Sequence, residues 1–207
     1  MTKQLNTEIE DKILEAAKQV FTEKGLVIAK MSDIANIAGI SRTSLNYYYR
    51  SKENLFQAII GQVAELFWPD LETVLEADLS VSEKIEGIVE KYTNMLISNP
   101  LIPQFMSIEV RRDLNQLLEI LSAKTGKFGA FKNFQDQIKQ EMLDGKIKKT
   151  SIPHLIVTIA SLCIFPFVAE PLLTKVFLNN NSGSFEEFIK ERQKIIMGLV
   201  NNLLEVK

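Results

Sequence analysis

The sequence predicts an all-α protein, and three observations indicate this. Apolar residues recur at the 3.6-residue period of a helix along nearly the whole chain, and no segment shows the alternation of a half-buried strand. Helix-capping residues and glycines divide the periodic stretches into helical lengths. Hydrophobic residues make up 46% of the 207 residues, so the chain can bury a sizeable core without disulfides or a structural metal.

The N-terminal third divides into four expected helices. Thr7 and Glu10 form a capping-box pattern at the first start, and Gly25 follows the last apolar position of that helix. Ser51 is placed to cap the fourth helix, which Pro69 either bends or ends early. The expected helices run from Thr7 to Gly25, Met31 to Ala38, Arg42 to Arg50 and Lys52 to about Ala77.

Several more helices are expected in the rest of the chain. Ser80 with Glu83 and Ser184 with Glu187 form capping boxes at two helix starts, and Gly145 closes another helix. The helices are expected at about Ser80 to Asn99, Phe105 to Arg111, Leu114 to Ser122, Phe131 to Gly145, Ser151 to Ala169 and Ser184 to Glu205.

One apolar run raises the question of a membrane. Residues 155–169 are mostly apolar and carry no charge, but the run is shorter than the ~20 residues a spanning helix needs, and Pro166 interrupts it. We therefore expect a buried helix and no membrane partner. The N-terminus has no apolar run of signal-peptide type, which leads us to expect a cytoplasmic protein.

The chain has one cysteine, Cys163, and one histidine, His154. An intramolecular disulfide and a Cys/His zinc site within one chain are therefore excluded, and we expect no metal or cofactor.

The stretch between the first and fourth expected helices carries the most specific pattern. Ala35 is small where two helices would cross, Gly39 can adopt the positive φ of a tight turn, and Ser41 can cap the second helix. Leu45 and Tyr49, four residues apart, are placed to face the core. Together these features predict a helix-turn-helix, whose second helix enters the DNA major groove. An ordinary helical hairpin with solvated charges is the alternative.

The outer face of that second helix is predicted to bind DNA. Arg42 can form a bidentate contact with guanine, and the Thr43 methyl group can contact thymine. Although the chain has a net charge of −2, the four basic residues and one acid between residues 30 and 52 give a local charge of +3. The predicted DNA contacts are Lys30, Ser41, Arg42, Thr43, Ser44, Asn46, Tyr47, Tyr48 and Lys52.

Residues 8–56 resemble the DNA-binding domain of the TetR/AcrR family. The resemblance rests on the stretches ILEAAKQVFTEKG, DIANIAGIS and Lys52-Glu53-Asn54-Leu55. Tyr48 and Lys52 match phosphate-binding positions of the family, while Asn46 replaces a tyrosine that binds phosphate in many members.

This resemblance implies an all-α chain with a three-helix DNA-binding head, residues 1–56, and a helical effector-binding and dimerisation body, residues 57–207. The implied function is that of a ligand-responsive transcriptional repressor that binds a palindromic double-stranded operator as a homodimer. A DNA-binding or interaction protein of the same fold without a small-molecule effector is the alternative. An enzyme is not expected, because the chain has no phosphate-binding glycine loop, no zinc-protease motif and no nucleophile elbow.

The last two expected helices each carry an apolar stripe at helical spacing. Such a pair could complete the core of one protomer, or it could pair with a second copy as a four-helix bundle, as the resemblance implies. The residues expected in this dimer interface are Leu162, Phe165, Ile196, Leu199, Val200 and Leu203.

Aromatic and methionine side chains gather in the middle helices, where the resemblance implies an effector cavity. Plain core packing is the alternative explanation of this composition. The residues expected to line a cavity for a small apolar effector are Phe105, Met106, Phe131, Phe134 and His154.

Overall fold

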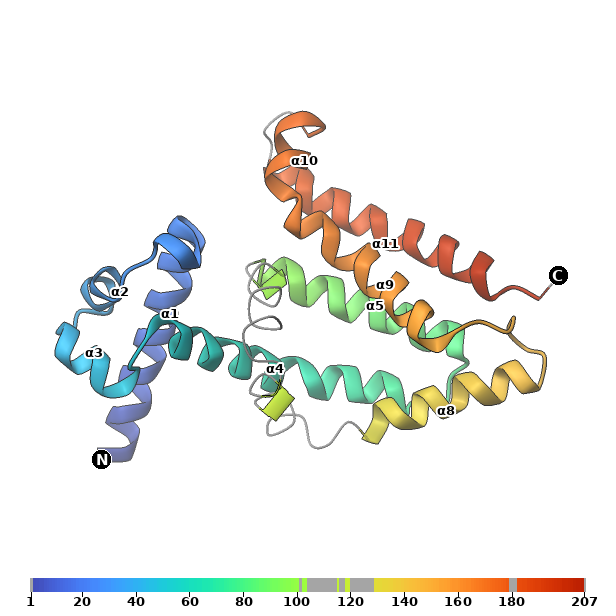
Figure 1. Ribbon diagram of the computed structural model, residues 1–207, viewed down its shortest axis with the longest axis horizontal. Coiled ribbons are helices and arrows are strands. Elements are labelled where there is room, and N and C mark those ends of the chain that lie inside the picture. The colour runs from blue at the N-terminus through green and yellow to red at the C-terminus, as the bar shows by residue number, and fades with distance from the viewer. Residues whose placement is uncertain are drawn as a thin grey trace. The chain divides into compact units, whose positions relative to one another are not determined.

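The computed structural model describes residues 2–100, 102–103, 115, 118–119, 129–178 and 182–206 (Figure 1). Every regular element in these ranges is a helix, as the sequence predicted. The described residues form two compact units: the first contains residues 2–65 with 115, 118 and 119, and the second contains the remaining residues from 66 onward. The division therefore lies nine residues later than the expected boundary at residue 56, inside a single helix that still buries Ile59, Ile60 and Val63 in the first unit.

Residues 2–65 of the first unit form three helices and the start of a fourth. Val20 of the first helix is fully buried, and Phe21 packs against Phe56 of the fourth helix with ring centroids 5.6 Å apart. The helices are α1 (Thr2–Ile28), α2 (Met31–Ala38), α3 (Arg42–Tyr48) and α4 (Lys52–Glu76). Helix α2 packs against both α1 and α3.

Two boundaries in this unit differ from the expectation. Helix α1 begins at Thr2, so Thr7 lies inside it and does not cap its start. Gly25 interrupts α1 with φ 71° and ψ 158°, as its position predicted, and a further turn follows to Ile28. Helix α3 ends two residues earlier than Arg50, because Tyr49 adopts an extended backbone with φ −135° and ψ 113°.

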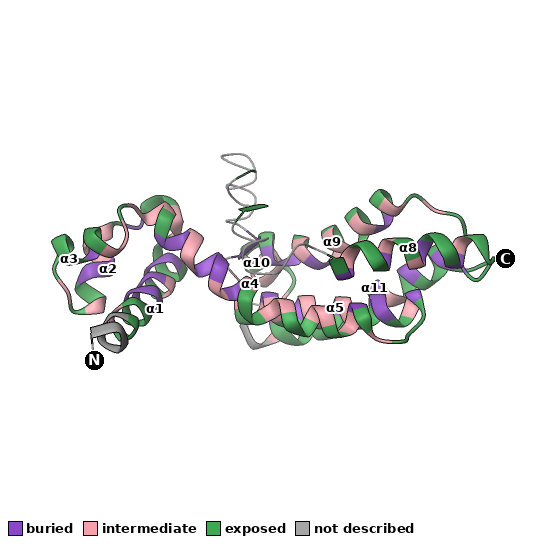
Figure 2. Ribbon diagram, turned by 90° about the horizontal axis from the view of Figure 1, so that it is seen from below, coloured by how far each residue is buried: buried purple, intermediate pink, exposed green. Residues whose placement is uncertain are grey.

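The second unit surrounds helix α5 (Val81–Ser98), which packs against the C-terminal part of α4 and against three later helices. The later helices are α8 (Gly129–Leu143), α9 (Ile152–Val168) and α11 (Ser182–Leu204). The short helix α10 (Glu170–Val176) packs on α9 and α11. Figure 2 shows the buried positions of α5 and α11 on the sides that face the other helices of this unit.

Helix starts in the second unit confirm one predicted cap and correct another. Ser80 accepts a hydrogen bond from the Glu83 amide, and the Glu83 carboxylate accepts one from the Ser80 amide, so the predicted capping box is present. Helix α11 begins at Ser182, which places Ser184 inside the helix rather than at its cap. The helix α10 was not expected as a separate element. The two helices expected between residues 105 and 122 lie almost entirely outside the described residues.

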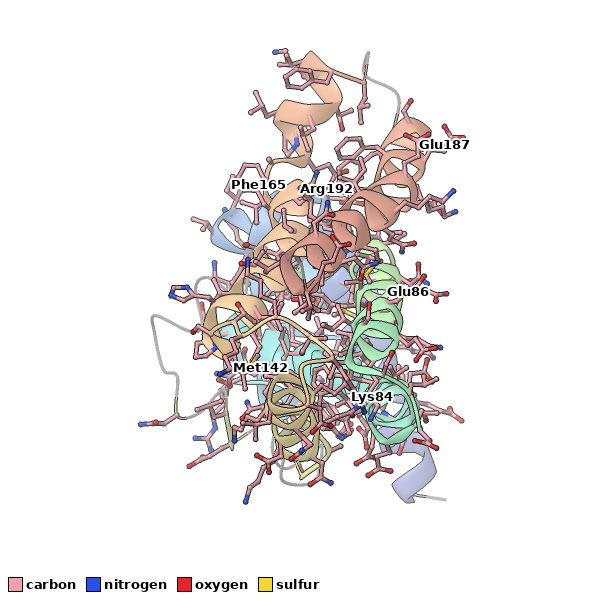
Figure 3. All side chains as sticks on the ribbon, turned by 90° about the vertical axis from the view of Figure 1, so that its right-hand side faces the viewer. Lys84, Glu86, Met142, Phe165, Glu187 and Arg192 are labelled. Atoms are coloured by element: carbon pink, nitrogen blue, oxygen red, sulfur yellow. The ribbon has the colours of Figure 1, made fainter. Side chains whose placement is uncertain are left out.

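A buried polar network joins α5 and α8 at one end of this unit. The Lys84 ammonium donates to the Leu75 carbonyl and to Gln137 Oε1, each at 2.7 Å. Gln137 Nε2 donates to Glu141 Oε1 at 2.9 Å, and this carboxylate accepts the Val81 amide at 3.1 Å. Figure 3 shows Lys84 on α5, with Met142 on the neighbouring α8. Because each buried charge has hydrogen-bond partners, the network fixes the start of α5 against α8.

The two C-terminal helices bury one side and expose another. Ile196 and Val200 are each 1% exposed and lie in the core of this unit. Neither residue is available for the dimer interface in which it was expected. Leu203 and Leu199 lie about 20° and 60° around α11 from Ile196, along one edge of the same stripe, and are 37% and 51% exposed. Part of the apolar stripe of α11 is therefore buried in the core of this unit, and its edge remains exposed.

In the described ranges no single helix has the length and hydropathy needed to cross a membrane. Only α9 together with α10 meets both criteria, as a pair bent by 63°.

Candidate DNA-binding face and apolar cavity

The turn between α2 and α3 has the geometry that the sequence predicted. Gly39 lies in the left-handed region with φ 68° and ψ 29°, which a side chain would disfavour. Its amide donates to the Asn36 carbonyl at 3.2 Å, and the Ile40 amide donates to the Ala35 carbonyl at 3.0 Å. These bonds satisfy the last carbonyls of α2 and turn the chain sharply into α3.

Helix α3 is held by its cap and by a single buried side chain. Ser41 Oγ accepts the Ser44 amide at 3.0 Å, so Ser41 is the predicted cap. Leu45 is fully buried. Tyr49, just past the helix, is half-buried, and burial together with the charges of Glu10 and Asp11 raises the pKa of its phenol. Helix α3 is thus anchored on one side only.

The opposite side of α3 is exposed. Arg42, Thr43 and Asn46 are all exposed, and Tyr47 is 84% exposed. Ser41 and Ser44 are exposed too. Tyr48 is partly buried and packs edge-on against Tyr47, with ring centroids 5.5 Å apart. A large aromatic side chain left in solvent on a face with arginine and short polar groups is typical of a binding surface.

Charge also distinguishes this face. The single acid of the segment, Asp33, pairs with Lys24 at 2.8 Å, and that hydrogen bond lowers the pKa of its carboxyl group. Lys30 is exposed just before α2, and neither it nor Arg42 forms an ion pair with any residue that the structure describes. Among the described residues Arg42 therefore has no acidic partner, which leaves its charge available for phosphate or base contacts.

Lys52 differs from the other predicted DNA contacts. Its ammonium donates to the carbonyls of Leu26, Val27 and Ala29 at 2.7, 2.9 and 3.3 Å. An ammonium group has three donors, and all three are used. The geometry therefore gives Lys52 the role of capping the end of α1 and joining it to the start of α4, and leaves no donor for the phosphate contact that the sequence suggested.

The role of Lys52 is tested with the substitution Lys52→Met, which keeps most of the stem and removes the ammonium. We expect the free energy of unfolding to fall by about 1–3 kcal/mol, because partly buried carbonyls lose charge-assisted hydrogen bonds. Urea unfolding followed by circular dichroism measures this. The control Lys12→Met removes an exposed lysine of α1 and should leave the stability within about 0.5 kcal/mol. A Lys52→Met protein that is as stable as the wild type would contradict the capping role.

An apolar cavity of about 200 Å³ lies inside the second unit. Helices α4, α5, α8 and α9 all contribute to its walls. The described lining residues are Phe67, Leu71, Ile85, Ile88, Tyr92, Phe131, Phe134, Ile138, Leu155, Ile156, Ile159 and Ala160.

Of the residues predicted for this cavity, Phe131 and Phe134 line it. Phe105 and Met106 lie outside the described residues. His154 is exposed and is not among the lining residues, because it precedes the inward-facing Leu155 by one position and so points about 100° around α9. The contribution of α5 was not predicted, although its Ile85, Ile88 and Tyr92 have helical spacing that could have indicated it.

An exposed apolar surface covers the outer sides of α9 and α11. Phe165 on α9 is 62% exposed, and Ile195 on α11 is 56% exposed, next to the leucines of α11 already described. Leu162 is only partly buried, and its carbonyl accepts a hydrogen bond from Arg192 Nε at 3.2 Å. Figure 3 shows Phe165 on the outside of α9 and Arg192 between the two helices. Ile195 was not predicted for this surface, although it is four residues before Leu199.

Known proteins are similar to this chain either over its N-terminal residues alone or over most of its length. Residues 13–59 match the family described as bacterial regulatory proteins, tetR family. The transcriptional repressor BepR of Brucella suis is 36% identical over 76 residues, which cover 37% of this chain and 35% of that protein. The probable transcriptional regulator YttP of Bacillus subtilis is 23% identical over 188 residues, which cover 89% of this chain and 90% of that protein.

The fold beyond the head has solved relatives. The regulator FadR of Bacillus subtilis, crystallised with stearoyl-CoA, superposes with a TM-score of 0.62 over 90% of this chain and 96% of that one, at 16% identity. At this identity the likeness concerns the fold alone. The chain is thus similar to regulators of the tetR family: residues 13–59 match the model of that family, and the chain shares the helical fold of a solved transcriptional regulator.

Proposed function

We propose that the protein is a homodimeric, ligand-responsive repressor that binds a palindromic operator through α3 of each protomer. The observation that carries this proposal is the exposed face of α3, where Arg42, Thr43, Asn46 and Tyr47 stand in solvent on a helix anchored by Leu45 alone. Helix α3 follows α2 through a tight glycine turn, as the recognition helix of a helix-turn-helix does.

In this proposal each residue has a definite part in binding. Arg42 and Thr43 start the helix, so they reach base edges when its N-terminus enters the major groove. Ser44, Tyr48 and Lys30 suit phosphate oxygens, which fix position rather than sequence. Lys52 supports the arrangement from behind through its three carbonyl bonds.

Dimerisation follows from the exposed apolar surface of α9 and α11. Large apolar side chains that cluster in solvent, such as Phe165, Ile195 and Leu199, are typical of protein interfaces. A two-fold interface presents the same surface from both copies, and a palindromic site needs two copies of α3. A second copy that packs on this surface would cover the exposed apolar side chains and supply the second α3.

Ligand response requires a link between the cavity and the head. Helix α4 supplies one, because Phe67 and Leu71 line the cavity while Lys52 and Leu55 of the same helix belong to the first unit. A ligand can change DNA affinity only by as much as it prefers one arrangement over another, typically ~1–3 kcal/mol. BepR is named as a repressor and FadR was solved with a ligand, which fits this mode of control.

Sequence recognition is tested with Arg42→Ala on a DNA site selected by the wild-type protein from a random pool. Binding should weaken by about 1–3 kcal/mol, and a second selection with the variant should relax the preference at one base position of each half-site. The control Lys132→Ala removes an equal charge from the exposed side of α8 and should change neither result. If the wild-type protein enriches no inverted repeat from the pool, the proposed function is wrong.

Assembly is tested with the double substitution Leu199→Glu and Leu203→Glu. The dimer should dissociate to monomers, because pairing the surfaces would bury carboxylates without partners. Light scattering after size-exclusion chromatography measures the mass. The control Leu143→Glu alters a 75% exposed leucine at the end of α8 and should leave the dimer intact. A wild-type protein that is monomeric at micromolar concentration would exclude this interface.

A further inference from the structure

We infer that Asn46 reads an adenine in each half of the operator, within about two base pairs of the base that Arg42 contacts. This inference rests on the proposed function, since it assigns one base of the DNA site that the regulator would bind. It is carried by the position of Asn46 on α3, by the surroundings of its side chain and by the hydrogen-bonding chemistry of an amide.

Asn46 lies on the same arc of α3 as the two residues that the proposed function places at base edges. Each helical residue is turned about 100° from the one before it. Seen down the axis, Asn46 therefore falls between Arg42 and Thr43, about 40° from the first and about 60° from the second, one turn further along α3. An orientation of α3 that brings Arg42 and Thr43 to the bases therefore brings Asn46 to them as well.

The neighbouring side chains leave this arc open. Asn46 is exposed, and the buried anchor Leu45 lies about 100° away around α3. The large ring of Tyr47 packs edge-on against Tyr48, with ring centroids 5.5 Å apart, on the side of α3 that turns away from Asn46. Asn46 and Thr43 are both short, so the backbone of α3 can approach the base edges closely in the major groove.

Within the described part of the chain, nothing in the fold uses the Asn46 amide. No hydrogen bond joins this amide to any residue in those ranges, and the cap of α3 is supplied by Ser41. Asparagine is also a poor residue for a helix interior, because its short amide competes for backbone hydrogen bonds. A residue that weakens a short helix without a structural return is expected at a functional position.

An amide selects adenine from the four bases. Its NH₂ group donates to adenine N7 while its carbonyl accepts from the adenine N6 amine, so two hydrogen bonds form together. Guanine presents two acceptors at these places, N7 and O6, and the amide carbonyl would then face O6 with no hydrogen between them. A bidentate pair of this kind discriminates against a wrong base by about five- to 150-fold.

The spacing along α3 places this adenine close to the base that Arg42 contacts. Four residues rise about 6 Å along a helix, and successive base pairs are about 3.4 Å apart. The two side chains therefore reach bases about one or two steps apart.

The first experiment selects DNA sites from a random pool with the full-length wild type and with two variants. The wild-type half-site should contain an adenine whose preference of about five- to 150-fold is lost in Asn46→Ala. This position should lie within about two base pairs of the one that Arg42→Ala relaxes. Asn46→Asp should shift the preference there from adenine to cytosine, because a carboxylate accepts from the cytosine N4 amine. The matched control Asn133→Ala alters an exposed asparagine of α8 and should leave every position unchanged.

Base analogues then test the two hydrogen bonds separately in the selected site. At the assigned adenine, 7-deazaadenine removes the N7 acceptor and nebularine removes the N6 amine. Each analogue should weaken binding of the wild type by about two- to tenfold, the range that one neutral hydrogen bond supports. Asn46→Ala should bind the natural and modified sites equally, as fluorescence anisotropy measures. The analogues act on the wild-type protein, so they decide the inference even where a variant does not fold.

The outcomes separate this inference from the proposed function. Unchanged base preferences in Asn46→Ala would overturn the inference, and so would an equal loss of affinity for all sequences, which indicates a phosphate contact. A base other than adenine at the position that Asn46→Ala relaxes would overturn it too. In these cases the wild-type protein still enriches an inverted repeat, and the proposed function stands. A wild-type protein that enriches no inverted repeat would overturn the proposed function and this inference with it.

Discussion

The position of α3 depends on the bonds that Lys52 makes on the far side of the head. Helix α3 has seven residues and one buried side chain, Leu45, so its own packing cannot fix its orientation. Its two ends are fixed instead. The turn at Gly39 ties it to α2, and the short link through Tyr49 ties it to α4, whose first residue is Lys52. By joining three carbonyls around residues 26–29, the Lys52 ammonium holds the start of α4 against the segment that leads into α2.

This arrangement explains how so short a helix can present an exposed face. Apart from Leu45, the groups that hold α3 lie outside the helix, so the residues on its outer side are not needed for folding. Arg42, Thr43 and Asn46 are therefore available for DNA. Helix α11 of the second unit also has buried and exposed apolar residues: Ile196 and Val200 complete the core, and Leu199 remains exposed. In both units part of a helix surface stabilises the fold and another part is left for a partner.

The features that the sequence predicted well are local. The turn at Gly39 and the caps at Ser41 and Ser80 depend on residues at most five apart. The carbonyls that Lys52 binds are 23 to 26 residues away, and neither period nor spacing indicates them. The same holds for the contact between Val81 and Glu141, which are 60 residues apart. Which part of the α11 stripe is buried could not be predicted either, because the whole stripe is apolar.

Photo-crosslinking from α3 tests the central claim most directly. With p-benzoylphenylalanine in place of Tyr47, which is 84% exposed on the outer side of α3, irradiation with the selected DNA should produce a covalent protein–DNA adduct. The same amino acid in place of Phe177, which is 69% exposed beyond α10, should produce none. An adduct from position 177 and none from position 47, in proteins that bind the DNA equally well, would contradict recognition through α3.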